Sequence, residues 1–98
     1  MDLGLKGKVA IVTGGSQGIG KGIVKVLKEE NVNVINFDIK EPSYDVDYFK
    51  VDVSKKEQVI KGIDYVISKY GRIDILVGSV LMQSSYSILN SKIISDFP

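Results

Sequence analysis

The 98-residue sequence contains no cysteine and no histidine. Without cysteine it can form neither a disulfide nor a thiolate metal site. Without histidine it lacks the side chain that most often serves as a general base, and also the commonest metal ligand. These absences exclude disulfide-stabilised scaffolds and cysteine- or histidine-based metal centres.

Long apolar runs and an excess of one charge are also missing. No stretch approaches the roughly 18 consecutive apolar residues of a membrane span, and residues 1–6 lack the apolar run of a signal peptide. The formal net charge of +1 gives no reason to expect a nucleic-acid or acidic membrane partner. With 44% hydrophobic and 26% charged residues, we expect one small, soluble, cytoplasmic domain.

The first half of the chain is typical of alternating strands and helices. Residues 9–12 are continuously apolar and end at glycines, which predicts a buried parallel strand. An amphipathic helix is predicted over 18–30, with strands over 32–38 and 47–53. The apolar face of that helix is expected to comprise Ile19, Ile23, Val26 and Leu27.

A second helix and a fourth strand follow. Ser54 and Glu57 have the spacing of a capping box, which predicts that a helix begins there. Gly71 is placed to end this helix, and residues 73–77 predict the next strand. Residues 39–46 are too few for the usual crossover helix, so a bare loop is expected between the second and third strands.

The composition changes at Gly78. From there to Pro98 the only charged residues are Lys92 and Asp96, and serine recurs six times. We therefore predict a nucleotide-binding half-domain over residues 1–77 and a divergent tail over 78–98. A frameshift, a non-native junction or a natural tail would each explain the change.

A glycine-rich loop, residues 13–20, joins the first strand to the first helix. Gly14 would allow a tight turn, Gly18 a close approach of the backbone to a pyrophosphate, and Gly20 close helix–strand packing. The helix N-terminus would add free N–H groups for the phosphates. Residues 15–21 also fit the start of a mononucleotide P-loop, but Gly22 stands where that motif needs serine or threonine.

Acidic residues end the second and third predicted strands. Asp38 lies where a carboxylate can accept both ribose hydroxyls and repel a 2′-phosphate, so NAD is favoured over NADP. Ile39 adds no positive charge, whereas Lys40 leaves dual use open. Asp52 and Val53 could flank the adenine; the alternative is that both acids are solvated strand ends. The predicted cofactor-binding residues are Thr13, Gly14, Ser16, Gln17, Gly18, Ile19, Gly20, Asp38, Ile39, Asp52 and Val53.

Over residues 5–77 the sequence resembles the short-chain dehydrogenase/reductase family. The T-G-x-x-x-G-I-G pattern at 13–20, Asp38, the pair Asp52-Val53 and the segment 71–77 carry the resemblance. It is most similar to archaeal aldose (glucose) 1-dehydrogenases. The resemblance implies an α/β fold, a truncated Rossmann-type doubly wound parallel sheet in the order 3-2-1-4 with one helix on each face. It also implies an NAD(P)-dependent oxidoreductase acting on an alcohol or sugar.

The resemblance ends after Val77. The family continues with N-N-A-G and later supplies a serine and a Tyr-x-x-x-Lys pair, and none of these aligns here; Tyr86 has Asn90 at that spacing. No catalytic residue and no metal ligand is therefore predicted, and the chain alone is expected to be inactive. Three hypotheses stay open: the nucleotide-binding fragment of an oxidoreductase, a non-catalytic NAD- or adenine-nucleotide-binding module, or a gene remnant. Self-association through the exposed fourth strand is also expected.

Overall fold

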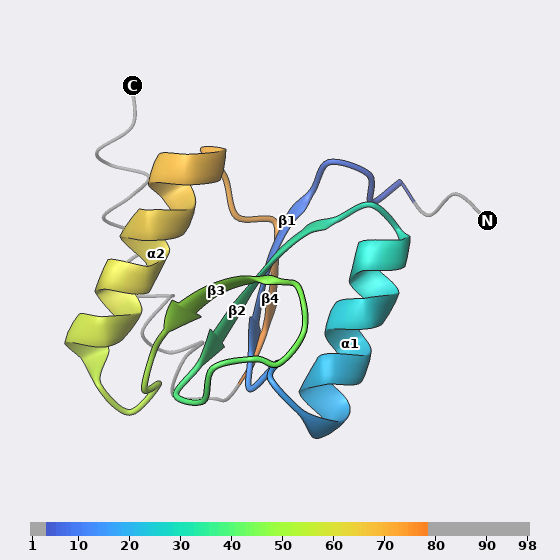
Figure 1. The fold of residues 1–98 in the computed structure, drawn as a ribbon. Helices are drawn as coiled ribbons and strands as arrows, with labels where there is room; N and C mark the ends of the chain where they lie inside the picture. The colour runs from blue at the N-terminus through green and yellow to red at the C-terminus, as the bar shows by residue number, and fades with distance from the viewer. Residues whose placement is uncertain (1–3, 79–98) are drawn as a thin grey trace.

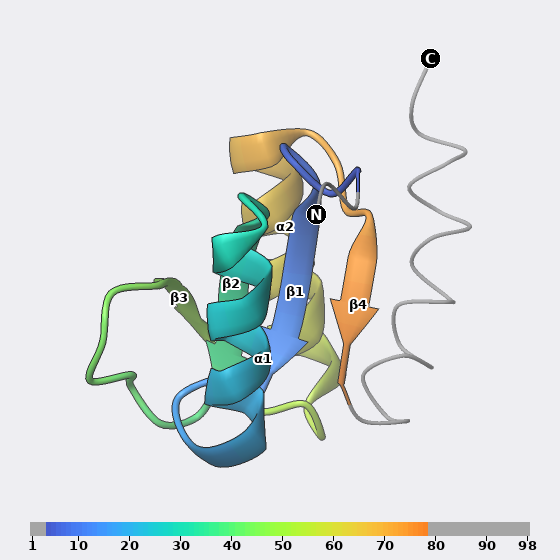
Figure 2. The same cartoon turned by 90° about the vertical axis from the view of Figure 1, so that its right-hand side faces the viewer.

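The computed structural model describes residues 4–78, which form a parallel four-stranded sheet between two helices (Figure 1). The strand order is β3-β2-β1-β4, as Figure 2 shows from the side, and α1 and α2 cover opposite faces. The predicted fold is therefore confirmed. The elements are β1 (Val9–Thr13), α1 (Gly18–Glu29), β2 (Asn33–Asp38), β3 (Asp47–Lys50), α2 (Lys56–Tyr70) and β4 (Ile75–Val77).

The core consists of two clusters, one on each face of the sheet. Side chains of successive strand residues point to opposite faces. Val9 and Ile11 of β1 therefore pack in the cluster under α2, whereas Ala10 and Val12 pack in the cluster under α1. All four are at most 2% exposed. This double coverage explains why the first strand reads as an uninterrupted apolar run.

The predicted apolar face of α1 is wrong in part. Ile23 and Leu27 pack on the core, but Ile19 is 86% exposed and Val26 59% exposed, while Val24 is fully buried. The rotation of the helix is set by Gly20, because a Cβ there would lie 2.1 Å from the Gly14 carbonyl oxygen. Only a glycine lets the helix approach the loop so closely, and this contact turns the flank with Ile19 outward.

The predicted capping box is also wrong. The α2 helix begins at Lys56, and its N-cap, Lys55, makes no side-chain hydrogen bond. The Ser54 hydroxyl instead donates to Asp52 Oδ1 at 2.7 Å, and the Ser54 N–H donates to the same oxygen, so Ser54 belongs to the turn before the helix. The predicted end of the helix is confirmed: Gly71 has φ 77°, and its N–H donates to the Ile67 carbonyl.

Residues 39–46 form a loop without a helix, as expected, and this loop lies against α1. The Tyr44 hydroxyl donates to the Gly15 carbonyl oxygen, Lys21 Nζ lies 5.1 Å from the centre of the Tyr44 ring, and Lys28 Nζ donates to the Asp45 carbonyl. The loop thus covers part of the sheet face that a crossover helix would cover.

Three strands are shorter than predicted. β2 begins at Asn33 instead of residue 32, β3 ends at Lys50 instead of residue 53, and β4 begins at Ile75 instead of residue 73. β3 ends early because its last residue pairs with Asp38, where β2 also ends. The Val51 N–H still donates to the Asp38 carbonyl oxygen at 3.2 Å, and β2 offers no further residue to pair with Asp52 and Val53.

Candidate functional site

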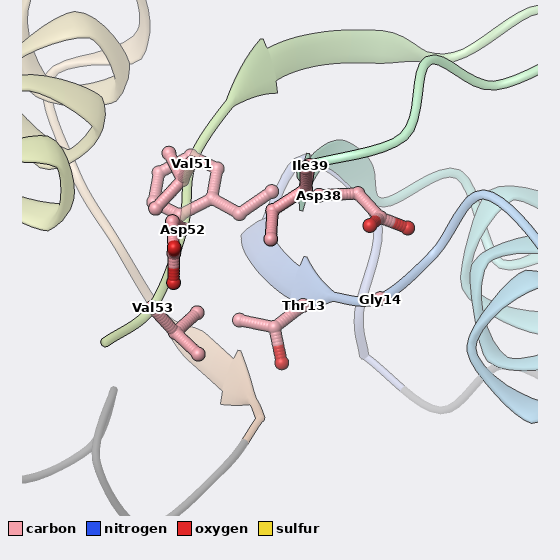
Figure 3. A pocket seen from close by; sticks show the side chains of 8 residues that line it. Thr13, Gly14, Asp38, Ile39, Val51, Asp52 and Val53 are labelled. Atoms are coloured by element: carbon pink, nitrogen blue, oxygen red, sulfur yellow. The ribbon is translucent and has the colours of Figure 1, made fainter. Parts of the chain in front are cut away.

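A hollow of about 250 Å³ lies where the carboxyl ends of β1, β2 and β3 meet (Figure 3). Carboxyl ends of parallel strands are where doubly wound folds bind their ligands. The hollow is lined by Thr13, Gly14, Phe37, Asp38, Ile39, Val51, Asp52 and Val53. Six of these eight residues are among the predicted cofactor-binding residues.

Phe37 and Val51 were missed by the sequence analysis. Both are at most 1% exposed and belong to the core under α2. Each directly precedes one of the singled-out residues, Asp38 or Asp52, so the available signal was an apolar residue immediately before a strand-end acid. They give the hollow an apolar floor between two carboxylates.

The glycine loop runs from β1 into α1 beside this hollow. Gly14 and Gly18 have φ of 68° and 63°, the left-handed region that favours glycine. No heavy atom lies within 4 Å of a Cβ built on Gly18, so the backbone there faces open space. No side chain caps the start of α1 at Gln17, and its first N–H groups are free to receive an anion.

The predicted loop residues from Ser16 to Gly20 lie outside the lining of the hollow. Ser16 is only 5% exposed, whereas Ile19 is almost fully exposed at the start of α1. Gln17 contributes its side chain to a surface contact, where its Oε1 accepts a hydrogen bond from Lys40 Nζ at 3.0 Å.

The two acids lie on opposite sides of the hollow, with Thr13 between them in the view of Figure 3. Asp38 Oδ2 accepts the Ser16 N–H at 3.1 Å, and Oδ1 accepts the Lys40 N–H at 3.2 Å. Backbone donors thus hold the plane of this carboxylate. One unused lone pair stays on each oxygen for a ligand.

Asp52 has a structural role in this chain. Its Oδ1 accepts both the Ser54 hydroxyl and the Ser54 N–H, at 2.7 and 3.0 Å. These hydrogen bonds hold the pKa of Asp52 below its usual value. The carboxylate therefore shapes the turn before α2 and also lines the hollow.

Tyr48, a residue that the sequence analysis did not single out, contacts the backbone of Asp38. Its hydroxyl donates to the carbonyl oxygen of Asp38 at 3.0 Å. Burial, together with the nearby Asp38 charge, raises the pKa of Tyr48, so the phenol stays protonated and remains a donor. This contact ties β3 to the end of β2.

The model of the family described as "short chain dehydrogenase" matches residues 8–93. The chain belongs to this family. Among curated members it is 33% identical over 87 residues to 3-oxoacyl-(acyl-carrier-protein) reductase FabG of Thermotoga maritima, covering 76% of this chain and 35% of that protein. The chain thus spans about a third of the length of the relatives that it matches.

Two solved short-chain dehydrogenase structures extend the comparison. Aldohexose dehydrogenase of Thermoplasma acidophilum, in ligand-free form, superposes with a TM-score of 0.75 at 38% identity, covering 78% of this chain and 30% of that one. A 3-ketoacyl-(acyl-carrier-protein) reductase from Brucella melitensis, complexed with NADH, gives 0.67 at 28% identity, covering 74% and 33%.

The short-chain dehydrogenase spacing Tyr-x-x-x-Lys does occur in this chain, at Tyr65 and Lys69 of α2. This pair lies before β4, whereas the resemblance places the catalytic pair after the fourth strand, so the two do not align. Both side chains contact Asp47, at the first residue of β3 and so at the opposite end of the sheet from the hollow. The hydrogen bond to Asp47 raises the pKa of Tyr65, which is the reverse of what a catalytic tyrosine needs.

Within residues 4–78, no helix is long and apolar enough to cross a membrane, and no group of three or more acidic, histidine or cysteine side chains is placed to hold a metal ion. The cytoplasmic location stays a prediction, and the predicted tail, apart from Gly78, lies outside the described residues.

Proposed function

We propose that this chain binds NAD as the nucleotide-binding part of an NAD-dependent oxidoreductase that acts on an alcohol or a sugar. The observation that carries the proposal is the Asp38 carboxylate, held at the carboxyl end of β2 beside the glycine loop and lining the hollow. That is the position where a doubly wound fold binds the adenosine ribose.

The residues present fit the parts of the dinucleotide. Asp38 would accept hydrogen bonds from the two ribose hydroxyls, and Asp52 with Val53 would flank the adenine over the apolar floor of the hollow. The uncapped start of α1 and the open backbone at Gly18 suit the pyrophosphate. When bound, NAD would supply hydride acceptance; the described residues would supply binding and orientation.

NAD is proposed over NADP because the Asp38 carboxylate is negatively charged and accepts hydrogen bonds from hydroxyl groups. A 2′-phosphate would meet the Asp38 carboxylate, which repels it, and has no hydroxyl hydrogen to offer in exchange. The relative complexed with NADH supports this choice. The similarity to aldohexose dehydrogenase supports a sugar as the substrate of the whole protein.

The second candidate is a module that binds NAD or an adenine nucleotide without catalysis. Among residues 4–78, the one Tyr-x-x-x-Lys pair faces Asp47 and not the hollow, which favours this candidate for the chain on its own. Hydride transfer from an aldose or a secondary alcohol to NAD, measured against a protein-free control, separates the two candidates.

Calorimetric titration of the 98-residue chain with NAD and with NADP tests the proposal. We expect weak binding, with NAD preferred, and loss of that preference in Asp38→Ala. Asp64→Ala is the matched control, because it removes the same charge from an exposed position of α2. Equal or tighter binding of NADP by the parent chain would contradict the proposal.

A further inference from the structure

We propose that Asn36 and Ser16 are positioning residues that hold the Asp38 carboxylate and thereby set the choice between NAD and NADP. Neither side chain lines the hollow, and both are buried. The inference rests on the proposed NAD binding. It adds that the choice between NAD and NADP depends on a buried polar bridge, formed by the hydrogen bonds of the Asn36 and Ser16 side chains.

Asn36 is the polar exception in the middle of β2. Its side chain is fully buried, on the opposite face of the sheet from its neighbours Ile35 and Phe37, and a buried amide is costly unless it is hydrogen-bonded. Its Oδ1 accepts the Gly15 N–H at 2.8 Å, and its Nδ2 donates to Ser16 Oγ at 2.9 Å. The amide thus joins β2 to the glycine loop with both of its polar groups used.

The loop is shaped around this amide. A Cβ on Gly15 would lie 2.7 Å from Asn36 Oδ1, so only glycine leaves room for the contact. The Tyr44 hydroxyl also donates to the Gly15 carbonyl, so both polar groups of the Gly15 backbone are occupied. Gly15 lies between the proposed ribose site and the proposed pyrophosphate site, and its placement affects both.

Ser16 continues the bridge from Asn36 to the segment after β2. Its hydroxyl donates to the Lys40 carbonyl oxygen at 2.5 Å, and its N–H donates to Asp38 Oδ2 at 3.1 Å. The Lys40 N–H in turn donates to Asp38 Oδ1. Each carboxylate oxygen therefore has one backbone donor, and both donors are placed by the Ser16 hydroxyl.

This arrangement favours NAD in two ways. It fixes the carboxylate so that one lone pair on each oxygen can receive a hydroxyl, and it occupies the Ser16 N–H, which would otherwise be a donor for a phosphate. Lys40 Nζ, the cation that could offset a 2′-phosphate, is held at Gln17 Oε1. Loosening the bridge would free the N–H, the carboxylate and the segment that carries Lys40.

The experiment uses two bridge variants, Ser16→Ala and Asn36→Val, with Ser16→Thr to restore the hydroxyl. Ser68→Ala on α2 and Asn33→Ala at the exposed start of β2 are matched controls. Dissociation constants for NAD and NADP are measured for each chain by calorimetry. The ¹⁵N–¹H NMR spectrum of each variant, which reports whether it is folded, also follows the Ser16 and Lys40 amides.

We expect Ser16→Ala to weaken NAD binding by about tenfold and to bring the NAD-to-NADP ratio towards one, as loss of a buried hydrogen-bond partner implies. The Ser16 and Lys40 amide signals should shift, while those of α2 stay in place. Ser16→Thr should recover the ratio, and the controls should keep it. Asn36→Val should follow Ser16→Ala where it folds.

Two results separate this inference from the proposed function. If the parent chain binds neither nucleotide, the proposed function fails and this inference fails with it. If the parent chain prefers NAD and folded Ser16→Ala keeps the same ratio, only the inference is overturned. A general loss of affinity with an unchanged ratio would also overturn it, since that outcome describes a structural role alone.

Discussion

The Tyr65 hydroxyl donates to Asp47 Oδ1 at 2.6 Å, and this contact joins α2 to the first residue of β3. Tyr70 and Lys69 donate to the other carboxylate oxygen, at 2.7 and 2.9 Å. Burial alone would raise the pKa of Asp47, but these three donors outweigh it and hold the pKa below its usual value. One carboxylate thus receives three side chains of a single helix.

Acid should therefore destabilise the chain through Asp47. Because the pKa is lowered in the folded state, the stabilisation is present above the ordinary carboxyl pKa and is lost as pH falls from about 4 downward. We expect the free energy of unfolding, measured in urea between pH 7 and pH 3, to decrease in that window. Asp47→Asn should flatten this dependence, and an equally steep slope in Asp47→Asn would contradict the assignment.

Replacing Tyr65 should separate stability from binding. Tyr65→Phe removes one donor from Asp47 and should lower the urea midpoint, at a cost of about 1 kcal/mol for one hydrogen bond. Nucleotide affinity should stay unchanged, because Tyr65 lies at the other end of the sheet from the hollow. A tenfold loss of NAD affinity in a folded Tyr65→Phe chain would show that this pair acts on the site.

Asp74 fixes β4 to β1. Its Oδ2 accepts the N–H of the buried Val9 at 2.9 Å, while Arg72 donates to both carboxylate oxygens. We expect Asp74→Ala to cost about 1–3 kcal/mol, since a buried backbone donor loses its acceptor. Asp74→Asn keeps an acceptor and should cost less, as should removal of the exposed Arg72 side chain. Urea unfolding ranks the three variants, and an equal loss in all three would contradict the role of the Val9 contact.

Two glycines of α1 make a matched pair. Gly20→Ala places a Cβ at 2.1 Å from the Gly14 carbonyl oxygen and should destabilise the loop–helix junction strongly. Gly22→Ala meets nothing within 4 Å and should stabilise the helix, by up to about 1 kcal/mol from helix propensity. Thermal unfolding followed by circular dichroism compares them. We expect the unfolding temperature to fall in Gly20→Ala and to rise in Gly22→Ala. A higher unfolding temperature in Gly20→Ala would show that the loop–helix junction is looser than described.

Self-association through β4 stays a prediction. Within the part of the chain that the structure describes, β4 pairs only with β1, and its residues Ile75, Leu76 and Val77 are half-buried. An apolar strand with an open edge is a template for another chain. Analytical ultracentrifugation over a range of concentrations, with hydrogen exchange of the β4 amides, tests it. A stable monomer whose β4 amides exchange freely would contradict it.

The fold could be predicted from the sequence because its signals are local. A continuous apolar strand, a glycine loop, an amphipathic helix and a terminal Gly71 each belong to a short window of the chain. The helix rotation could not be predicted in the same way. It depends on the contact between Gly20 and Gly14 through space, and this contact leaves Ile19 and Val26 exposed.

The candidate site was predicted only in part, because some of its residues have a local sequence pattern and others are brought together only by contacts through space. Asp38 and the glycine loop have a recognisable spacing, so their meeting at one edge of the sheet follows from topology. Asn36 falls inside the predicted strand 32–38, and no local pattern marks its buried amide as a partner of Gly15. Ser54 was misassigned as the start of the helix because its spacing to Glu57 does not reveal the turn in which its hydroxyl and its N–H donate to Asp52.

The Asp47 contacts and the Asp38 hollow lie at opposite ends of the same parallel sheet. A change at one end therefore need not compromise the other, and the two can be altered as separate modules. Stability in acid could be raised by replacing Asp47 and its partners with a neutral hydrogen-bonding network, while the choice of nucleotide stays unchanged. Conversely, specificity could be rewritten around Ser16 with the anchoring of β3 to α2 left intact.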